Sequence, residues 1–316
     1  MRLTINRKLI IFTGGIAVLL LVIGFSIYGS FSRTKGIINT SIALKEIQVN
    51  VVKLREAEKN MLLWELKNNE YYQSGQSEYQ QSFYQQLAAN VALIKNLSDS
   101  DLSEDYGIRK QLQTLLQKHD AYKSKFDKLV ALKKQRGFGD YGIIGEMREI
   151  MHELEENYES LRNQNDILQM RRHEKDYLLR QDRSYYDKAL DLANNIEARA
   201  SGAFAAKVAE YMSLYGELIA LEEAIGTDER SGIYAELNEI YSDISMEATT
   251  LIDEINQKSE EGRDRTTLII AILILGGAVM AILIGLLITK GINNSINRAT
   301  GAIARIAEGE LDVTLE

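Results

Sequence analysis

Residues 267–289 contain no charged side chain, and this run constrains the fold more than any other feature of the sequence. They are almost all Leu, Ile, Ala, Val, Met and Gly, and about 20 such residues at ~1.5 Å per residue cross a bilayer core as a helix. Residues 9–31 form a second apolar run. It has the basic start of a signal peptide, but its length and the lack of an Ala-x-Ala site favour an uncleaved span. The sequence therefore predicts two transmembrane helices.

Basic residues flank both runs and predict the orientation of the chain. Because cytoplasmic flanks are enriched in Lys and Arg, both termini are expected in the cytoplasm, with residues 32–265 exported. In a bacterium this describes a multi-pass inner-membrane protein with a periplasmic domain. The expected parts are a cytoplasmic N-terminus (1–8), two transmembrane helices (9–31 and 266–289), a periplasmic domain (32–265) and a cytoplasmic segment (290–316). The basic flanks are Arg2, Arg7, Lys8, Lys290, Arg298 and Arg305.

Composition predicts an all-α fold. The 316 residues include no proline, where average usage of about 5% would give roughly sixteen. Helix-forming residues dominate, and no alternating strand pattern of useful length is present. The absence of cysteine excludes a disulfide scaffold and thiolate metal sites. The net charge of −8 argues against binding to nucleic acid.

Clusters of Gly, Ser and Asp divide the exported part into periodic stretches. They predict six helices. The expected ranges are 32–73, 76–97, 102–136, 145–181, 184–225 and 231–265.

The exported part contains an internal echo at an offset of 116 residues, so that 54–63 lines up with 170–179. A pair of tyrosines follows each copy, at Tyr71 and Tyr185 with their next neighbours. Duplication of a helical module is one interpretation, and a chance match between helical sequences is the other.

Each copy of the echo places a glutamate on an apolar helix face. Glu58 and Glu174 keep the three-four spacing of their apolar neighbours, which predicts that both point inward. A buried carboxylate must be paired, or it will take up a proton. The candidate partners are Arg55, Arg148, Arg171 and His152. We expect structural salt bridges from Glu58, Glu174, Arg148 and His152.

Five cationic side chains gather between residues 171 and 183 of this acidic protein. They could form an exposed ladder of weak ion pairs with Asp176. A carboxylate ligand also needs such donors, above all guanidinium groups that bind it in bidentate fashion. Tyr234 is on the last exported helix, where core packing is the alternative role. The candidate ligand-binding residues are Arg171, Arg172, Lys175, Arg180, Arg55 and Tyr234.

No pattern in the chain predicts enzyme chemistry. The sequence has three histidines, no nucleophile elbow and no phosphate-binding loop. His152 with a glutamate one turn later is too little for a metal-binding helical bundle, which needs several ligands from separate helices. We therefore expect no catalytic residues, no metal and no cofactor.

The second copy of the echo resembles the signature of helical bimodular sensor domains of bacterial receptors. The resemblance covers approximately residues 32–265, and its first half departs from the pattern, with Ala57 and Trp64 where the second half has His173 and Arg180. It implies two stacked four-helix bundles, a small ligand such as an organic acid, and a homodimer. The residues that carry it are Gly142, Gly145, Met147, Arg148, His152, Glu155 and the run 171–180.

The segment after Lys290 resembles the first helix of a HAMP domain, a relay found in bacterial transducers. Its apolar residues alternate spacings of four and three, as in helices that pair, and an acidic Gly-Glu-Leu connector follows at 309–311. Ser295 stands where the family usually has proline. The seam residues are Ile292, Ile296, Ala299, Ile303 and Ile306.

Together the two resemblances imply the input half of a receptor whose output domain is absent from this chain. A chemoreceptor of the methyl-accepting type is the expected parent. A histidine kinase or a cyclic-dinucleotide enzyme is the alternative, because both use HAMP inputs. Recognition of a ligand-loaded periplasmic binding protein also stays open, and an exposed apolar patch would favour it.

Overall fold

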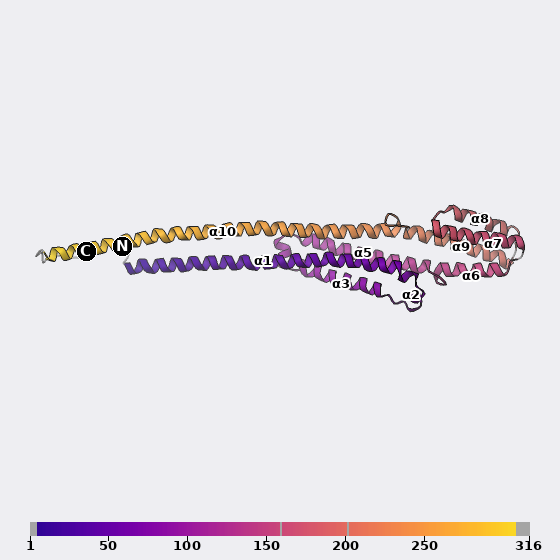
Figure 1. Cartoon of the computed structure of the whole chain (residues 1–316), viewed down its shortest axis with the longest axis horizontal. Coiled ribbons are helices and arrows are strands. Elements are labelled where there is room, and N and C mark those ends of the chain that lie inside the picture. Colours follow the sequence, from indigo (N-terminus) through magenta and orange to yellow (C-terminus); the bar gives the residue numbers. More distant parts are fainter. Residues whose placement is uncertain (1–4, 159, 201, 308–316) are drawn as a thin grey trace. The chain divides into compact units, whose positions relative to one another are not determined.

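The computed structural model describes residues 5–158, 160–200 and 202–307. Over these residues the chain is helical throughout, with ten α-helices, one short 3-10 helix and no strand (Figure 1). The expected all-α class is therefore confirmed. The helices are α1 (Ile5–Leu63), η1 (Glu65–Lys67), α2 (Asn69–Ser74), α3 (Glu78–Ser98), α4 (Asp101–Asp105), α5 (Arg109–Arg136), α6 (Gly142–Glu156), α7 (Leu161–Arg180), α8 (Ser184–Glu197), α9 (Gly202–Ile225) and α10 (Gly232–Ala307).

Four of the six predicted helices are interrupted in the structure, and one of these is 102–136, which is divided between α4 and α5. α1 ends at Leu63, where residues 32–73 were expected to be continuous, and the Asn68 side chain then accepts a hydrogen bond from the Glu70 amide at the start of α2. The expected helix 145–181 is interrupted between α6 and α7, and the Ser160 hydroxyl accepts from the Asn163 amide there. The expected helix 184–225 is divided between α8 and α9. At the starts of α2 and α7 a side-chain cap satisfies the helix N-terminus without Gly or Pro.

The chain divides into two compact units, residues 1–41 with 254–316 and residues 42–253. The first unit contains the apolar parts of α1 and α10, and both helices are long and apolar enough to cross a membrane. A Cβ added to Gly277 would lie 2.3 Å from a Leu19 methyl group, so the absent side chain lets α1 and α10 approach closely here. The predicted HAMP connector at 308–313 lies outside the described residues.

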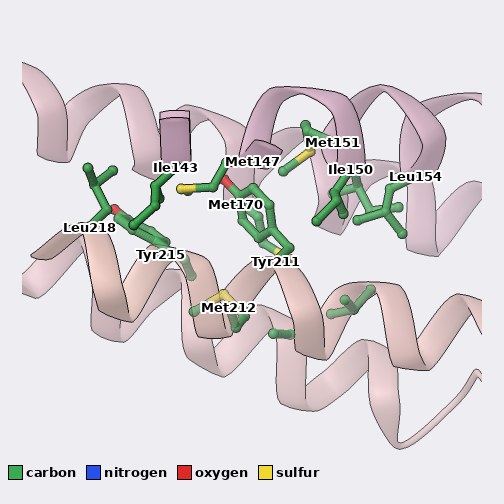
Figure 2. Packing of buried hydrophobic residues seen from close by; sticks show 14 of the residues in the cluster. Ile143, Met147, Ile150, Met151, Leu154, Met170, Tyr211, Met212, Tyr215 and Leu218 are labelled. Atoms are coloured by element: carbon green, nitrogen blue, oxygen red, sulfur yellow. The ribbon is translucent and has the colours of Figure 1, made fainter. Parts of the chain in front are cut away.

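In the second unit, α6, α7, α8 and α9 share one apolar core. Figure 2 shows Ile143 and Met147 of α6 facing Tyr211 and Tyr215 of α9. Elsewhere in the unit, α3 packs on α5, and the rings of Phe83 and Phe126 stack with centroids 3.8 Å apart.

Two glycine turns of the same kind connect helices of the second unit. Gly137 follows α5 with φ of 81°, and a Cβ there would lie 1.8 Å from the Tyr141 carbonyl oxygen. Gly226 follows α9 with φ of 87°, and its Cβ would lie 2.0 Å from the Ser231 carbonyl oxygen. Only glycine suits these positions, because both φ and the available space exclude a side chain.

Candidate functional site

Glu58 is buried between α1 and α5, as its helical phase predicted. Arg55 Nη1 donates to Oε1 at 2.7 Å, and the Tyr122 hydroxyl donates to Oε2. Burial raises the pKa of Glu58, while the charge of Arg55 and the bond from Tyr122 oppose that rise. The predicted Arg55 ion pair is therefore present.

Both terminal nitrogens of Arg55 donate to other groups of the protein. Its Nη2 donates to Glu229 Oε1 at 2.8 Å and to Asn238 Oδ1 at 3.1 Å, and its guanidinium lies 5.3 Å from the centre of the Tyr241 ring. A ligand carboxylate at Arg55 would have to replace one of these partners. The contacts connect α1 to α10 and to the turn that precedes it.

Glu174 is also buried, which confirms its inward phase, but it pairs with none of the four candidate partners. The Tyr211 hydroxyl donates to Oε2 at 2.8 Å, and Lys175 Nζ lies 2.8 Å from Oε1. Burial and the Glu174 charge hold the pKa of Tyr211 well above its usual value. Arg171, expected as a candidate partner, instead donates to Glu155 Oε2 at 2.6 Å.

The two buried glutamates and their tyrosines form an equivalent pair of sites that the 116-residue echo identified only in part. Tyr122 and Tyr211 are 89 residues apart, and at this same offset Phe126 matches Tyr215. All four are buried on α5 and α9. The offset also brings Gly137 of the first glycine turn to Gly226 of the second. This second echo is visible in the sequence, and it is the signal that would have found the tyrosines.

The expected cationic ladder on α7 lies on an accessible face. Arg172 is 81% exposed and stands 3.9 Å from Asp176, whose other oxygen is 3.6 Å from Arg180. Arg180 also donates to the Tyr185 hydroxyl at 2.8 Å, and Lys175 is 61% exposed. These distances fit weak surface ion pairs.

Two further predicted residues, Arg148 and His152, pair outside the core. Arg148 Nη1 lies 3.0 Å from Asp140, and both side chains are exposed. His152 Nδ1 lies 3.7 Å from Glu155 and is half exposed. Neither contacts Glu58 or Glu174 by any hydrogen bond or ion pair among the described residues, so they do not form the buried bridges that we expected.

Lys133 on α5 is a cation that the sequence analysis did not single out. Its ammonium group lies 5.5 Å from the centre of the Tyr234 ring, and no carboxylate of the described chain lies within 4.0 Å of it. Burial lowers the pKa of Lys133 to about 8, opposed by Glu222 and reinforced by the positive charges of Arg136 and Lys67. Burial raises the pKa of Tyr234 to about 12.

Arg136 completes the polar cluster around Lys133. Its Nε bonds to Glu222 of α9, whose side chain is almost fully buried. The charges of Glu222, Arg136 and Lys67 all act on Lys133, and the cluster, defined here as these four residues, has three cationic groups and one carboxylate. An anion beside Lys133 would reduce this excess of positive charge and lower the cost of keeping its ammonium charge buried.

The hollows of the second unit include three that described residues line. One of about 260 Å³ is next to the Lys133 cluster, because Glu222 lines it together with Tyr177 and Arg183. A hollow of about 460 Å³ contains Arg148 and His152 but is mainly acidic. A further hollow, of about 770 Å³, is lined by Glu65, Glu70, Glu78 and polar neighbours. The first is lined by one cation, Arg183, with the carboxylates of Glu222 and Glu223 and the aromatic ring of Tyr177.

Among the described residues, no group of three His, Asp or Glu side chains is placed to hold a metal ion. Comparisons with protein-family models, with curated proteins and with solved structures find no match for this chain.

Proposed function

We propose that this chain is the input region of a bacterial transmembrane receptor that binds a small organic anion outside the cytoplasm. In this proposal α1 and α10 span the inner membrane, and residues 32–265 form a periplasmic sensor of two stacked four-helix bundles. Helices α6 to α9 would form one bundle. The parts of α1, α3, α5 and α10 that lie in residues 42–253 would form the other.

The course of α10 is the observation that carries the proposal. This helix begins at Gly232, contributes Asn238 to the Arg55 network, and continues through the apolar run to Ala307. A ligand that favours one packing of α10 in the sensor would thus act on the same helix that enters the membrane. A small slide or rotation of a helix is a known way to carry such a change. The ligand can shift the equilibrium only by its preference for one packing.

The Lys133 cluster supports an anion as the ligand. A half-buried ammonium without a carboxylate partner is costly, and a bound carboxylate would supply the missing charge. Arg136 offers the planar donor fork that suits a carboxylate, although Glu222 now occupies part of it. The α7 cations Arg171, Arg172, Lys175 and Arg180 remain an alternative binding surface.

The parent protein in this proposal is a chemoreceptor, and the chain itself performs no catalysis. A histidine kinase or a cyclic-dinucleotide enzyme is the second candidate, favoured by the same α10 arrangement. Recognition of a ligand-loaded periplasmic binding protein is a further candidate, and an exposed apolar patch on the sensor would favour it.

Two experiments test the proposal. For topology, a reporter that is active only in the periplasm should give activity when fused at residue 140 and none when fused after Glu316. Equal activity at both sites would contradict the two-span topology.

For ligand binding, the full chain in lipid nanodiscs should show a raised unfolding temperature with one or more members of a panel of small organic acids. Lys133→Met should weaken that binding about ten- to a hundredfold, the effect of one hydrogen bond to a charged group. Lys128→Met, on an exposed part of the same helix, is the matched control. If Arg171→Ala weakens binding and Lys133→Met does not, the site is on α7.

A further inference from the structure

The hollow of about 770 Å³ lies along the connection from α1 to α3, and the proposed function does not use it. We call it the α2 hollow. Its volume is within the range of sites that hold small organic molecules. The described residues that line it include three carboxylates, Glu65 of η1, Glu70 of α2 and Glu78 of α3, but no Lys, Arg or His. The lining is therefore negatively charged.

Two of these three carboxylates have no partner in the described part of the chain. Glu65 is bound, because the Ser77 hydroxyl donates to Oε2 and the Glu78 amide donates to Oε1 at 3.0 Å. No Lys, Arg or His nitrogen of the described residues lies within 4.0 Å of the carboxylate of Glu70 or Glu78. A cation in the α2 hollow would supply the missing opposite charge.

Tyr71 of α2 gives a second, independent observation. Its side chain lines the α2 hollow and is only 2% exposed, and its hydroxyl has no hydrogen-bond partner among the described residues. Lys134 Nζ lies over the ring, 4.7 Å from its centre. A buried hydroxyl without a partner is costly, and native structures rarely leave one so. A molecule in the α2 hollow that carries N–H donors would provide that partner.

The arrangement of the carboxylates indicates which kind of cation fits. Among the described residues, no group of three His, Asp or Glu side chains is close enough to share a metal ion. Glu65, Glu70 and Glu78 therefore border one hollow without converging on one point. A cation with its charges spread along a chain suits such a site better than a single metal ion. The rings of Tyr71 and Tyr84, which also line the hollow, would contact the methylene groups and the charges of that chain.

We propose that the α2 hollow binds an organic cation with two or more ammonium groups, of the class of linear alkyl polyamines. Glu70 and Glu78 would each hold one ammonium group, and the Tyr71 hydroxyl would accept a hydrogen bond from the ligand. This inference does not depend on the anion of the proposed function. The ligand has the opposite charge, and no residue of the Lys133 cluster lines the α2 hollow.

Calorimetric titration of the full chain with spermidine and with 1,4-diaminobutane tests the inference. The chain would be held in nanodiscs of zwitterionic lipid, because anionic lipids themselves attract polyamines. Both probes should bind, and added salt should weaken binding because it screens the carboxylates. n-Butylamine should bind at least about tenfold more weakly, since it can pair with only one carboxylate. 1,4-Butanediol has a similar length but no charge and should give no heat of binding.

Single substitutions identify the site. Glu70→Gln and Glu78→Gln should each weaken spermidine binding about tenfold, the effect of one hydrogen bond to a charged group. Both side chains are exposed, so neither substitution should disturb folding. Tyr71→Phe should weaken binding by a smaller factor, about threefold to tenfold, because a neutral acceptor is lost. Glu239→Gln, at an exposed site on α10, is the matched control and should bind as the native chain does.

Three outcomes would overturn the inference. The first is the absence of any heat from spermidine and 1,4-diaminobutane with the folded native chain. The second is an equal loss of binding in Glu239→Gln and Glu70→Gln, which would indicate diffuse attraction to an acidic protein. The third is binding of magnesium chloride with the same dependence on Glu70 and Glu78, which would indicate a metal site. The organic-acid titrations of the proposed function use other probes and another variant, so the two can fail separately.

Discussion

The regions around Glu58 and Glu174 solve one physical problem in two ways. Both bury a glutamate on an apolar helix face, and both supply a tyrosine hydroxyl from a helix distant in sequence. The cations differ, because Arg55 has only 12% of its side chain exposed whereas Lys175 is 61% exposed. The charge of a buried carboxylate can therefore be compensated either by a buried arginine network or by a surface lysine.

This difference predicts how each region responds to the loss of its carboxylate. Arg55 is held in place by Glu58, Glu229 and Asn238 and cannot turn toward water without breaking the other contacts. Lys175 can turn toward water, because most of its side chain is already exposed. The Glu58 region should therefore be the more rigid and the more costly to disrupt.

Removal of Glu58 should produce the largest effect. Glu58→Ala leaves the buried Arg55 and Tyr122 without their shared acceptor, and broken buried pairs cost about 3–5 kcal/mol. Glu174→Ala should cost about 1–3 kcal/mol, because only the Tyr211 hydroxyl is left buried without its partner. Chemical denaturation of the full chain in detergent, followed by circular dichroism, measures both. Glu239→Ala, at an exposed site on α10, is the control. Equal costs for Glu58→Ala and Glu174→Ala would contradict the expected difference between the two regions.

Loss of the tyrosine hydroxyls should give the opposite order, with the larger cost in free energy of unfolding in the Glu174 region. Tyr211→Phe takes away the buried donor of Glu174 and should cost about 1.5–3 kcal/mol, as expected for a hydrogen bond to a charged group. Tyr122→Phe should cost less, because Arg55 still bonds to Glu58. The same chemical denaturation, followed by circular dichroism, measures both costs. A larger cost for Tyr122→Phe would show that the Arg55 network depends on that hydroxyl.

The inward positions of Glu58 and Glu174 could be predicted because helical periodicity is a local property of the sequence. Their tyrosine partners could not be assigned from that period, since Tyr211 is 37 residues from Glu174 and on a different helix. Lys133 was missed for a related reason. A lysine on an amphipathic helix is ordinarily exposed, and only the packing of Tyr234 and Arg136 around it shows otherwise.

Helix boundaries were predictable where Gly or Asp clusters mark them, as after Arg136. The interruption before Ser160 was not predicted. A single capping hydroxyl marks the start of α7 there, and Ser is also common within exposed helices. The echo aligns Glu58 with Glu174, and each of these buried carboxylates accepts a hydrogen bond from a tyrosine hydroxyl. It could not indicate which cation each region would use, because Arg55 and Arg171 are aligned by the offset and yet bond to different acceptors.

A third contrast concerns pH. His119 on α5 is buried, with Nδ1 at 2.8 Å from the Leu115 carbonyl oxygen and Nε2 at 3.2 Å from the Asn90 amide nitrogen. Its counterpart at the 89-residue offset is the buried Val208. Burial lowers the pKa of His119, opposed by the Leu115 bond and the Asp120 charge. The Glu58 region therefore contains a fully buried histidine, whereas His173, beside Glu174, is only partly buried, although burial lowers its pKa as well.

The sign of the pH effect follows from the lowered pKa. The unfolded chain takes up a proton at His119 below about pH 6.5 while the folded chain does not. Stability should therefore fall as pH drops, by about 1.4 kcal/mol per unit, until the lower folded pKa is reached. His119→Gln should flatten that slope relative to the native chain, as measured by denaturation at pH 5.5, 6.5 and 7.5 in the same detergent. An identical slope in both proteins would show that His119 does not titrate differently on folding.

The smallest effect should come from the exposed ladder on α7. Arg172 has 81% of its side chain exposed and lies 3.9 Å from Asp176, so water competes effectively for both charges. Arg172→Ala should change the free energy of unfolding by less than about 0.5 kcal/mol, as is usual for surface substitutions. Arg171→Ala should cost more than Arg172→Ala, because Arg171 is bonded to Glu155, whose side chain is largely buried. Denaturation at low and at high salt measures both, since screening should erase the small contribution of Arg172 first. A large loss of stability from Arg172→Ala would mean that this arginine contacts another part of the protein in the membrane, and the simplest assignment of α7 as a solvated face would then be wrong.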